Sequence, residues 1–249
     1  AAIKIQVGEG RCFLTGGTES MSNIPFYFSK EYQEFLGALM RAKSPVEKIG
    51  ILCKFRFKFL TPRIGLQLGL TDSVCGLNMG QTAEVLAKEF GITRNDQDKF
   101  ALTSHQRALQ SRAFLREEIV PVVPSPKYAQ AVQDDNGPRE QQTFEALAKL
   151  KPYFERGTGT VTAGNSSQIT DGAAALLVAG ESRARELIRE PLGYVKSFAF
   201  AGVEPNRMGI GPAHAIPKAL KKANLRLSDI QAVEINEAFA VQVLACLKA

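Results

Sequence analysis

The sequence predicts an α/β fold. A run of small apolar residues at 172–179 predicts a strand buried on both faces, and a helical pattern at 181–188 follows it directly. The stretch VEINEAFA at 233–240 is a short apolar run that passes through a polar pair into a second helical pattern. Two further helical patterns lie at 81–91 and 93–112. Strands that lead into helices in this way favour the α/β class.

Composition places the chain among soluble globular proteins, with 45% apolar and 22% charged residues in 249. No apolar run approaches the roughly 18 residues of a membrane span. The chain opens without Met and without the basic start and apolar core of a signal peptide, so we interpret it as part of a longer chain. The expected location is the cytoplasm, or the mitochondrial matrix if a targeting segment precedes it.

The positive charge is concentrated in one segment. Residues 41–63 hold seven Lys and Arg against Glu47 alone, which leaves 24 charges of each sign elsewhere. One short patch without a recognised motif argues against nucleic-acid binding. Within the patch, Phe residues at 55, 57 and 59 alternate with cations, which predicts a strand or an extended amphipathic arm. Two interpretations stay open: an edge strand protected by its charges, or a surface for an anionic membrane or an acidic partner subunit.

The remaining elements follow in chain order. Residues 12–14 predict a buried strand that runs into a glycine turn and a polar loop, TGGTESMSNIPF. The helix from Gln81 ends at Gly91, and Thr93 caps the next helix with Asp96 three residues on. Residues 121–142 are Pro-rich and then polar, which predicts a loop, and helix returns at TFEALAKL.

The segment GTGTVTAGNSSQ at 157–168 interleaves Gly with Thr and Ser, so its backbone can approach a ligand and offer N–H and hydroxyl donors. It matches no G-x-G-x-x-G or Walker pattern. After it, PLGYVKSFAFAG predicts a strand, and Pro217 in the first turn predicts the start of a helix with His214 in the loop before it. We assign a structural role to His214, and a surface or capping role to His105, which lies near the middle of a helix among polar residues.

The pair Asn236 and Glu237 has two interpretations at this stage. Asn is a good N-cap, so Asn236 could close the helix that follows. Strand-to-helix junctions are also where α/β proteins present polar groups to ligands.

Three strings taken together, GGTESMSNIPF, TVTAGNSSQITDGAAALL and VEINEAFA, with MGQTAEVLAKEFGITRNDQDKFALTSHQRA between them, resemble the thiolases. These enzymes cleave or form 3-ketoacyl-CoA by acyl transfer through a Cys thioester. The basic segment and PLGYVKSFAF are most similar to the β subunit of the fatty-acid-oxidation trifunctional complex. The resemblance covers almost the whole chain.

The resemblance implies a layered αβαβα fold with an inserted loop domain, truncated here at both ends. Residues 1–21 would end the N-terminal half, 22–168 would form the loop domain that covers CoA, and 169–249 would start the C-terminal half. The implied substrates are acyl-CoA and CoA, with no other cofactor and no metal. The implied assembly is a homo-oligomer, with an α subunit or a membrane surface as a further contact through residues 41–63.

Site residues follow from the same resemblance. Asn236 would hold a water in the oxyanion hole that receives the thioester oxygen. The residues implied in substrate and CoA binding are Ser167, Ala163, Phe154, Met208, Arg139, Met79 and Phe239. Of these, Arg139 would pair with a CoA phosphate. Asn78 stands where many thiolases carry His.

The nucleophilic Cys, the His of a G-H-P motif and the Cys of a C-x-G-G-G motif do not occur in this chain. Its own thiols, Cys12, Cys53, Cys75 and Cys246, are widely spaced and without an adjacent base, so we predict that they are inert and that the chain alone is inactive. The alternative hypothesis is a non-catalytic protein that binds CoA esters or another subunit.

Overall fold

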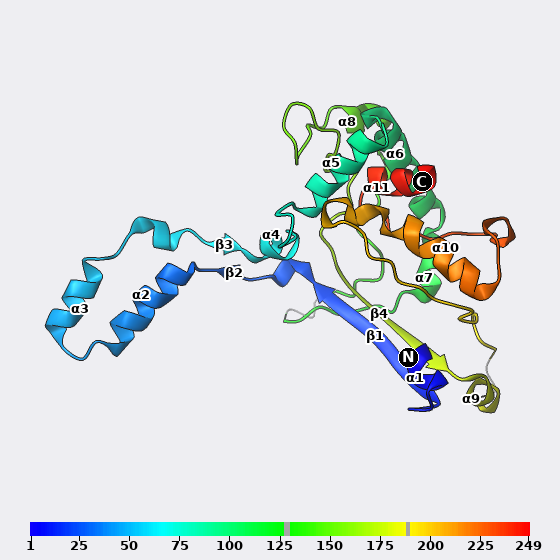
Figure 1. The fold of residues 1–249 in the computed structure, drawn as a ribbon, viewed down its shortest axis with the longest axis horizontal. Coiled ribbons are helices and arrows are strands. Elements are labelled where there is room, and N and C mark those ends of the chain that lie inside the picture. Colours follow the sequence, from blue (N-terminus) through cyan, green and yellow to red (C-terminus); the bar gives the residue numbers. More distant parts are fainter. Residues whose placement is uncertain (127–129, 188–189) are drawn as a thin grey trace. The chain divides into compact units, whose positions relative to one another are not determined.

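The computed structural model describes residues 1–126, 130–187 and 190–249. The chain divides into two compact units (Figure 1). Unit 1 comprises Ala1–Asn78 and Ile169–Pro191, and unit 2 comprises Met79–Gln168 and Leu192–Ala249.

The longest strands belong to unit 1. β1 (Cys12–Ser20) pairs antiparallel with β4 (Asp171–Ala179), with Cys12 opposite Ala179 and Ser20 opposite Asp171. The predicted glycine turn is wrong, because β1 continues through both glycines. At Gly16 a Cβ would lie 2.5 Å from the carbonyl oxygen of Ala174, so this register needs glycine there.

Strand β4 is largely exposed, which corrects the prediction of a strand buried on both faces. Leu176 and Leu177 are 63% and 62% exposed, because β1 is the only strand that pairs with β4 in the described part of the chain. At the end of the pair where Cys12 lies opposite Ala179 there are two short helices, α1 (Ala2–Gln6) and α9 (Glu181–Glu186). The helix predicted at 181–188 is therefore present, although its last position falls outside the described residues.

The rest of unit 1 carries a helical hairpin. Strands β2 (Phe26–Tyr27) and β3 (Arg63–Ile64) pair at its base, next to α4 (Gly65–Gly69) and the 3₁₀ turn η1 (Met21–Asn23). Its helices are α2 (Lys30–Arg41) and α3 (Pro45–Leu52), and η2 (Phe57–Leu60) follows them. Ser29 caps α2, and Ser44 with Glu47 forms a capping box on α3.

The predicted alternating strand at 54–59 is wrong. Phe59 lies in a 3₁₀ turn and is 8% exposed, with its ring centroid 5.9 Å from Tyr32, 5.5 Å from Phe35 and 6.0 Å from Phe55. Phe57, by contrast, is 86% exposed. Aromatic packing within the hairpin thus decides the local conformation in place of strand pairing.

Unit 2 is mainly helical. Its helices are α5 (Met79–Glu89), α6 (Arg94–Gln110), α7 (Arg112–Glu118), α8 (Phe144–Ala148), α10 (Gly211–Ala223) and α11 (Ala240–Lys248), with 3₁₀ turns η3 (Pro205–Ile210) and η4 (Leu227–Asp229). The core forms where α5, α11 and η3 meet. Its fully buried side chains include Leu86, Val161, Ile210, Val241 and Ala245.

The junction of α5 and α6 confirms the sequence prediction. Gly91 has φ of 58°, a left-handed conformation that favours glycine. Thr93 and Asp96 form a capping box at the start of α6. The loop predicted at 121–142 is also present, with a single bridge between Val122 and Val132, although residues 127–129 lie outside the described part.

The two strands and the helix start predicted in the last third of the chain are wrong. Residues 191–202 and 233–239 form no regular strand, since no described strand pairs with them and an unpaired strand leaves its backbone groups unsatisfied. Helix α10 begins at Gly211 with Pro212 in its first turn, so Pro217 and His214 both lie inside the helix. Helix α11 begins at Ala240 with Phe239 at its N-cap, so Asn236 does not cap it.

None of the helices in the described ranges combines the length and the apolar character that a membrane crossing requires.

Candidate active site

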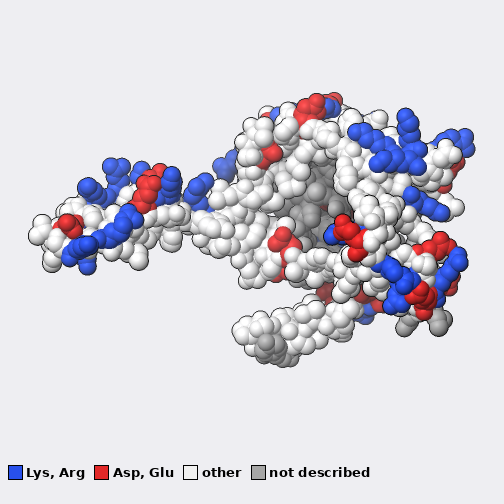
Figure 2. All heavy atoms as spheres, turned by 60° about the horizontal axis from the view of Figure 1, so that its bottom comes forward, with Lys and Arg blue, Asp and Glu red and all other residues white. Residues whose placement is uncertain are grey.

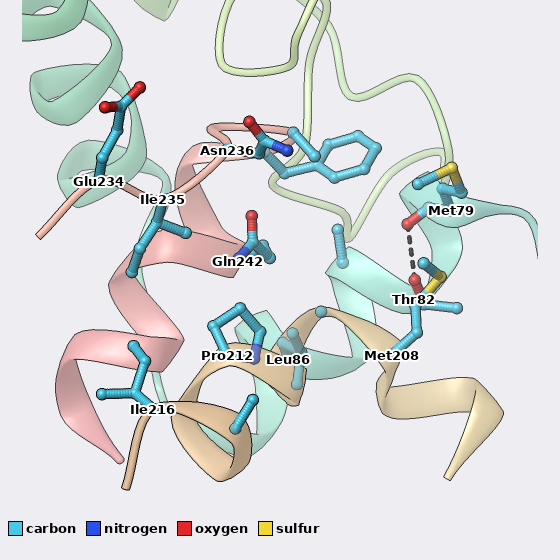
Figure 3. Close-up of a pocket in the computed structure, with 15 residues that line it drawn as sticks. Met79, Thr82, Leu86, Met208, Pro212, Ile216, Glu234, Ile235, Asn236 and Gln242 are labelled. Atoms are coloured by element: carbon cyan, nitrogen blue, oxygen red, sulfur yellow. Dashed lines mark hydrogen bonds between the residues drawn. The ribbon is translucent and has the colours of Figure 1, made fainter. Parts of the chain in front are cut away.

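A cavity of about 410 Å³ lies within unit 2. Its walls come from α5, from the end of η3 and the start of α10, from residues 234–239 and from α11 (Figure 3). Most of the lining is apolar, and the side chains with hydrogen-bonding groups are Thr82, Glu234, Asn236 and Gln242. An apolar cavity with few polar groups is the usual form of a small-molecule site.

Four of the predicted site residues meet in this cavity: Met79, Met208, Asn236 and Phe239. Figure 3 shows Asn236 on one side of the space and the two methionines on another. Asn236 is exposed, and its amide makes no hydrogen bond to any residue in the described ranges, so the group is accessible to a ligand. The cavity thus places a polar amide next to apolar walls.

The other four predicted residues lie outside the lining. Phe154 supports the cavity indirectly, since its ring packs edge to face on Phe239 with centroids 5.9 Å apart. Ser167 and Ala163 are exposed on the loop at 160–168, and Arg139 is exposed on the loop before α8. The structure therefore brings half of the predicted set together around one space.

Buried carboxylates hold the loop at 160–168. Glu84 of α5 is 3% exposed, and its carboxylate accepts hydrogen bonds from the backbone N–H groups of Thr160 and Val161 at 2.9 Å each. Asn165 donates to Asp98 at 3.0 Å and accepts from the Thr162 N–H at 2.8 Å. A carboxylate that accepts from backbone N–H groups makes strong, charge-assisted bonds, so the loop conformation is well determined.

The loop is joined in turn to the cavity wall. The Ser167 N–H donates to the Ala238 carbonyl at 2.8 Å, and the Ala240 N–H donates to the Asn165 carbonyl at 2.9 Å. These bonds flank an antiparallel bridge between Ser166 and Phe239. They set the path of the backbone two residues after Asn236.

Two titratable groups near these elements have shifted pKa values. Burial lowers the pKa of His105, and the nearby Arg139 cation lowers it further; the His105 Nδ1 accepts from the Arg139 N–H at 3.3 Å. Burial raises the pKa of the Cys246 thiol, whose Sγ lies 3.2 Å from the Gly209 carbonyl oxygen. Neither group is placed as a general base or nucleophile at the Asn236 amide.

Cys12 and Cys75 are half-buried and Cys53 is exposed, and all four thiols are free. Within the described residues, no group of three His, Cys, Asp or Glu side chains could hold a metal ion.

Several residues that line the cavity were not predicted from the sequence, chiefly Gln242, Glu234, Thr82, Pro212 and Ile216. For Gln242 a signal existed, because it is a polar residue among Val241, Val243 and Ala245 on a buried helix. A polar side chain in such a position indicates a buried contact. The others lie on segments distant in sequence that only the fold brings together.

Models of the thiolase N-terminal domain and the thiolase C-terminal domain match residues 1–182 and 189–249. The chain belongs to the thiolase family. It is 42% identical to a 3-ketoacyl-CoA thiolase of Pseudoalteromonas translucida, covering 99% of this chain and 56% of the relative, and 40% identical to one of Escherichia coli, covering 98% and 56%. The chain thus spans little more than half the length of these relatives.

Solved structures of related enzymes have a similar fold. The structure superposes on human mitochondrial 3-ketoacyl-CoA thiolase in complex with CoA with a TM-score of 0.82 at 36% identity, covering 99% of this chain and 57% of that one. It superposes on acetyl-CoA acetyltransferase from Syntrophomonas wolfei with the same TM-score at 34% identity, again covering 99% and 57%. The family and fold class expected from the sequence are confirmed. The division at residues 21 and 168 stays a prediction.

Proposed function

We propose that this chain is the acyl-CoA-binding part of a 3-ketoacyl-CoA thiolase that acts in fatty-acid β-oxidation. The observation that carries the proposal is the meeting of Asn236 with Met79, Met208 and Phe239 around one cavity. The first supplies a polar amide, and the other three supply apolar walls suited to an aliphatic ligand. The relatives from Pseudoalteromonas translucida and Escherichia coli are 3-ketoacyl-CoA thiolases, which supports the same reaction class.

In thiolytic cleavage, the bond between C2 and C3 of 3-ketoacyl-CoA breaks and the acyl group joins the thiol sulfur of CoA. The thiol proton balances the proton taken up at C2 of the departing acetyl-CoA. As the bond between C2 and C3 breaks, negative charge develops on the thioester oxygen of the departing acetyl-CoA enolate. We assign to Asn236 the role of holding a water against that oxygen, where a fixed dipole stabilises the transition state.

The CoA-binding role extends to residues beyond the cavity. We propose that Ser167 and Ala163 contact the pantetheine arm from the loop at 160–168, and that Phe154 supports the wall behind Phe239. Arg139 is exposed and offers a guanidinium that suits a CoA phosphate. These assignments follow the family resemblance residue by residue.

We further infer that the 249 residues alone do not turn over substrate. The resemblance assigns the nucleophile and both proton-transfer groups to motifs absent from this sequence. Of the four thiols that are present, Cys246 has a raised pKa, which lowers its thiolate fraction. The chain is therefore proposed to bind ligand without completing the reaction.

Calorimetry with CoA tests the binding, and an assay with acetoacetyl-CoA plus CoA tests the absence of turnover. Wild type should bind CoA in a salt-sensitive way, and Arg139→Ala should weaken binding while Arg226→Ala, another exposed arginine, should not. Turnover above that of Asn236→Ala would contradict the inactivity. No CoA binding by a folded wild-type chain would contradict the proposed site.

The hairpin supports a second candidate function, which is non-catalytic binding of CoA esters or of another subunit. Met40, Val46 and Phe57 are 86%, 80% and 86% exposed there, next to the cations of residues 41–63. Figure 2 shows Lys and Arg side chains along this arm. We propose that it contacts an α subunit or an anionic membrane, in a homo-oligomer located in the cytoplasm or the mitochondrial matrix. Flotation with anionic vesicles tests whether the hairpin binds a membrane. The double change Lys54→Glu and Lys58→Glu should abolish vesicle binding.

A further inference from the structure

One polar side chain in the cavity is buried and has an unused acceptor. Gln242 of α11 is 6% exposed and lines the cavity, and its Oε1 accepts no hydrogen bond from any residue in the described ranges. Its Nε2 lies 3.7 Å from the Cys246 Sγ. Figure 3 shows the Gln242 amide pointing into the space below Asn236.

A second glutamine provides a comparison. Gln97 is 0% exposed, and its Oε1 is likewise without a partner among the described residues. Its Nε2 donates to the Thr160 Oγ1 at 2.9 Å, and the residue does not line the cavity. An unpaired acceptor in a packed interior only destabilises the fold, whereas one that faces a cavity can be satisfied by a ligand.

Gly209 leaves room for this arrangement. A Cβ at position 209 would lie 2.7 Å from the Gln242 Cγ and 2.9 Å from the Leu86 Cδ1. A side chain at 209 would therefore displace Gln242 from its present position. The glycine thus lets the glutamine pack against η3 with its amide directed at the cavity.

We propose that Gln242 is a further ligand-binding residue, whose Oε1 accepts a hydrogen bond from an amide N–H of the pantetheine arm of CoA or acyl-CoA. This inference rests on the proposed function, because it takes the ligand to be a CoA ester. The cavity walls around Gln242 are mostly apolar, which suits an aliphatic ligand with isolated donors. A fatty-acyl chain and its thioester carry no donor, whereas pantetheine carries amide N–H groups between short methylene segments.

The two amides in the cavity then have different tasks. The Asn236 amide serves the thioester oxygen, which only accepts hydrogen bonds. The Gln242 Oε1 serves a donor elsewhere on the same ligand. Binding would satisfy a buried acceptor, and loss of that acceptor would leave the ligand N–H unpaired in an apolar space.

Calorimetry on the full 249-residue chain tests the proposal with three probes: CoA, pantetheine and methyl hexanoate, which has no donor. Gln242→Met removes both polar atoms and keeps a similar shape. It should weaken binding of CoA and pantetheine about tenfold and leave methyl hexanoate unchanged. Gln97→Met, the matched control for a buried glutamine outside the cavity, should weaken CoA and pantetheine much less than Gln242→Met does. Thermal unfolding of each variant checks the fold.

Equal CoA affinity in wild type and Gln242→Met would overturn this inference but not the proposed function. It would mean that a water serves the ligand N–H as well as the Gln242 Oε1 does. Equal losses for methyl hexanoate would also overturn it, since they would show a reshaped cavity. A wild-type chain that binds none of the probes would overturn the proposed function and this inference with it. Should Gln242→Met fail to fold, Gly209→Ala displaces the same side chain, and it should weaken CoA more than methyl hexanoate.

Discussion

Replacement of Glu84 by Met should destabilise the loop that carries Ser167. The Glu84 Oε1 accepts from the N–H groups of Thr160 and Val161, both at 2.9 Å. Its Oε2 accepts from the Thr160 N–H at 3.0 Å and the Thr160 hydroxyl at 3.1 Å. Methionine removes both oxygens from a site that is 3% exposed.

The magnitude follows from the donors left behind. Two backbone N–H groups lose their acceptor, and each buried donor without a partner costs about 1–3 kcal/mol. The free energy of unfolding of unit 2 should fall by about 2–6 kcal/mol in Glu84→Met. Glu84→Gln keeps one oxygen for both N–H groups, so it should cost only about 1–2 kcal/mol.

Hydrogen exchange of peptides that cover residues 157–168 measures this loss locally, and urea unfolding measures it for the chain. Lys88→Met serves as a control on the same helix, because the Lys88 side chain is 62% exposed and its ion pair with Glu155 is worth under about 1 kcal/mol. If the amides of residues 157–168 exchange equally slowly in Glu84→Met and Lys88→Met, the Glu84 carboxylate does not hold the loop and the reasoning is refuted.

Two further predictions concern titratable groups. The Thr93 hydroxyl and N–H hold the pKa of Asp96 below its ordinary value of 3.8, so the stability that Asp96 adds is complete above that value and is lost as the pH falls through the lowered one. The stability difference between wild type and Asp96→Asn should accordingly vanish between about pH 6 and pH 2 in urea unfolding curves, and a constant difference would contradict the assignment. Burial raises the pKa of the Cys246 thiol, so in the folded chain it should react with Ellman's reagent at least about tenfold more slowly than the exposed Cys53. Single-thiol variants give both rates, and equal rates would show that Cys246 is accessible.

Local signals in the sequence were sufficient for the junction of α5 and α6 in unit 2, but not for the start of α10. The boundary between α5 and α6 rests on Gly91, Thr93 and Asp96, and each acts through its own backbone or its immediate neighbours. Strands were less predictable, because they depend on partners. The apolar run in 194–202 has the composition of a strand but no described partner, and 54–59 has the alternation of a strand but packs as an aromatic cluster.

The site was predictable only as far as the family motifs reach. Resemblance identified Met79, Met208, Asn236 and Phe239, which the structure brings around one cavity. It did not identify Gln242, whose role depends on an unpaired oxygen that only coordinates reveal. Residue type alone suggested that Asn236 caps a helix, whereas the helix begins four residues later.

The bridge between Ser166 and Phe239 has a consequence for the order of folding. It joins positions 73 residues apart, so forming it carries the entropic cost of closing a long loop before the contact adds any stability. We expect the individual helices of unit 2 to form early, since the hydrogen bonds within each helix are local, and this bridge to form late. The cavity wall at Phe239 would then be complete only in the last stage of folding, so a CoA ester would find its binding surface only on chains that have finished folding.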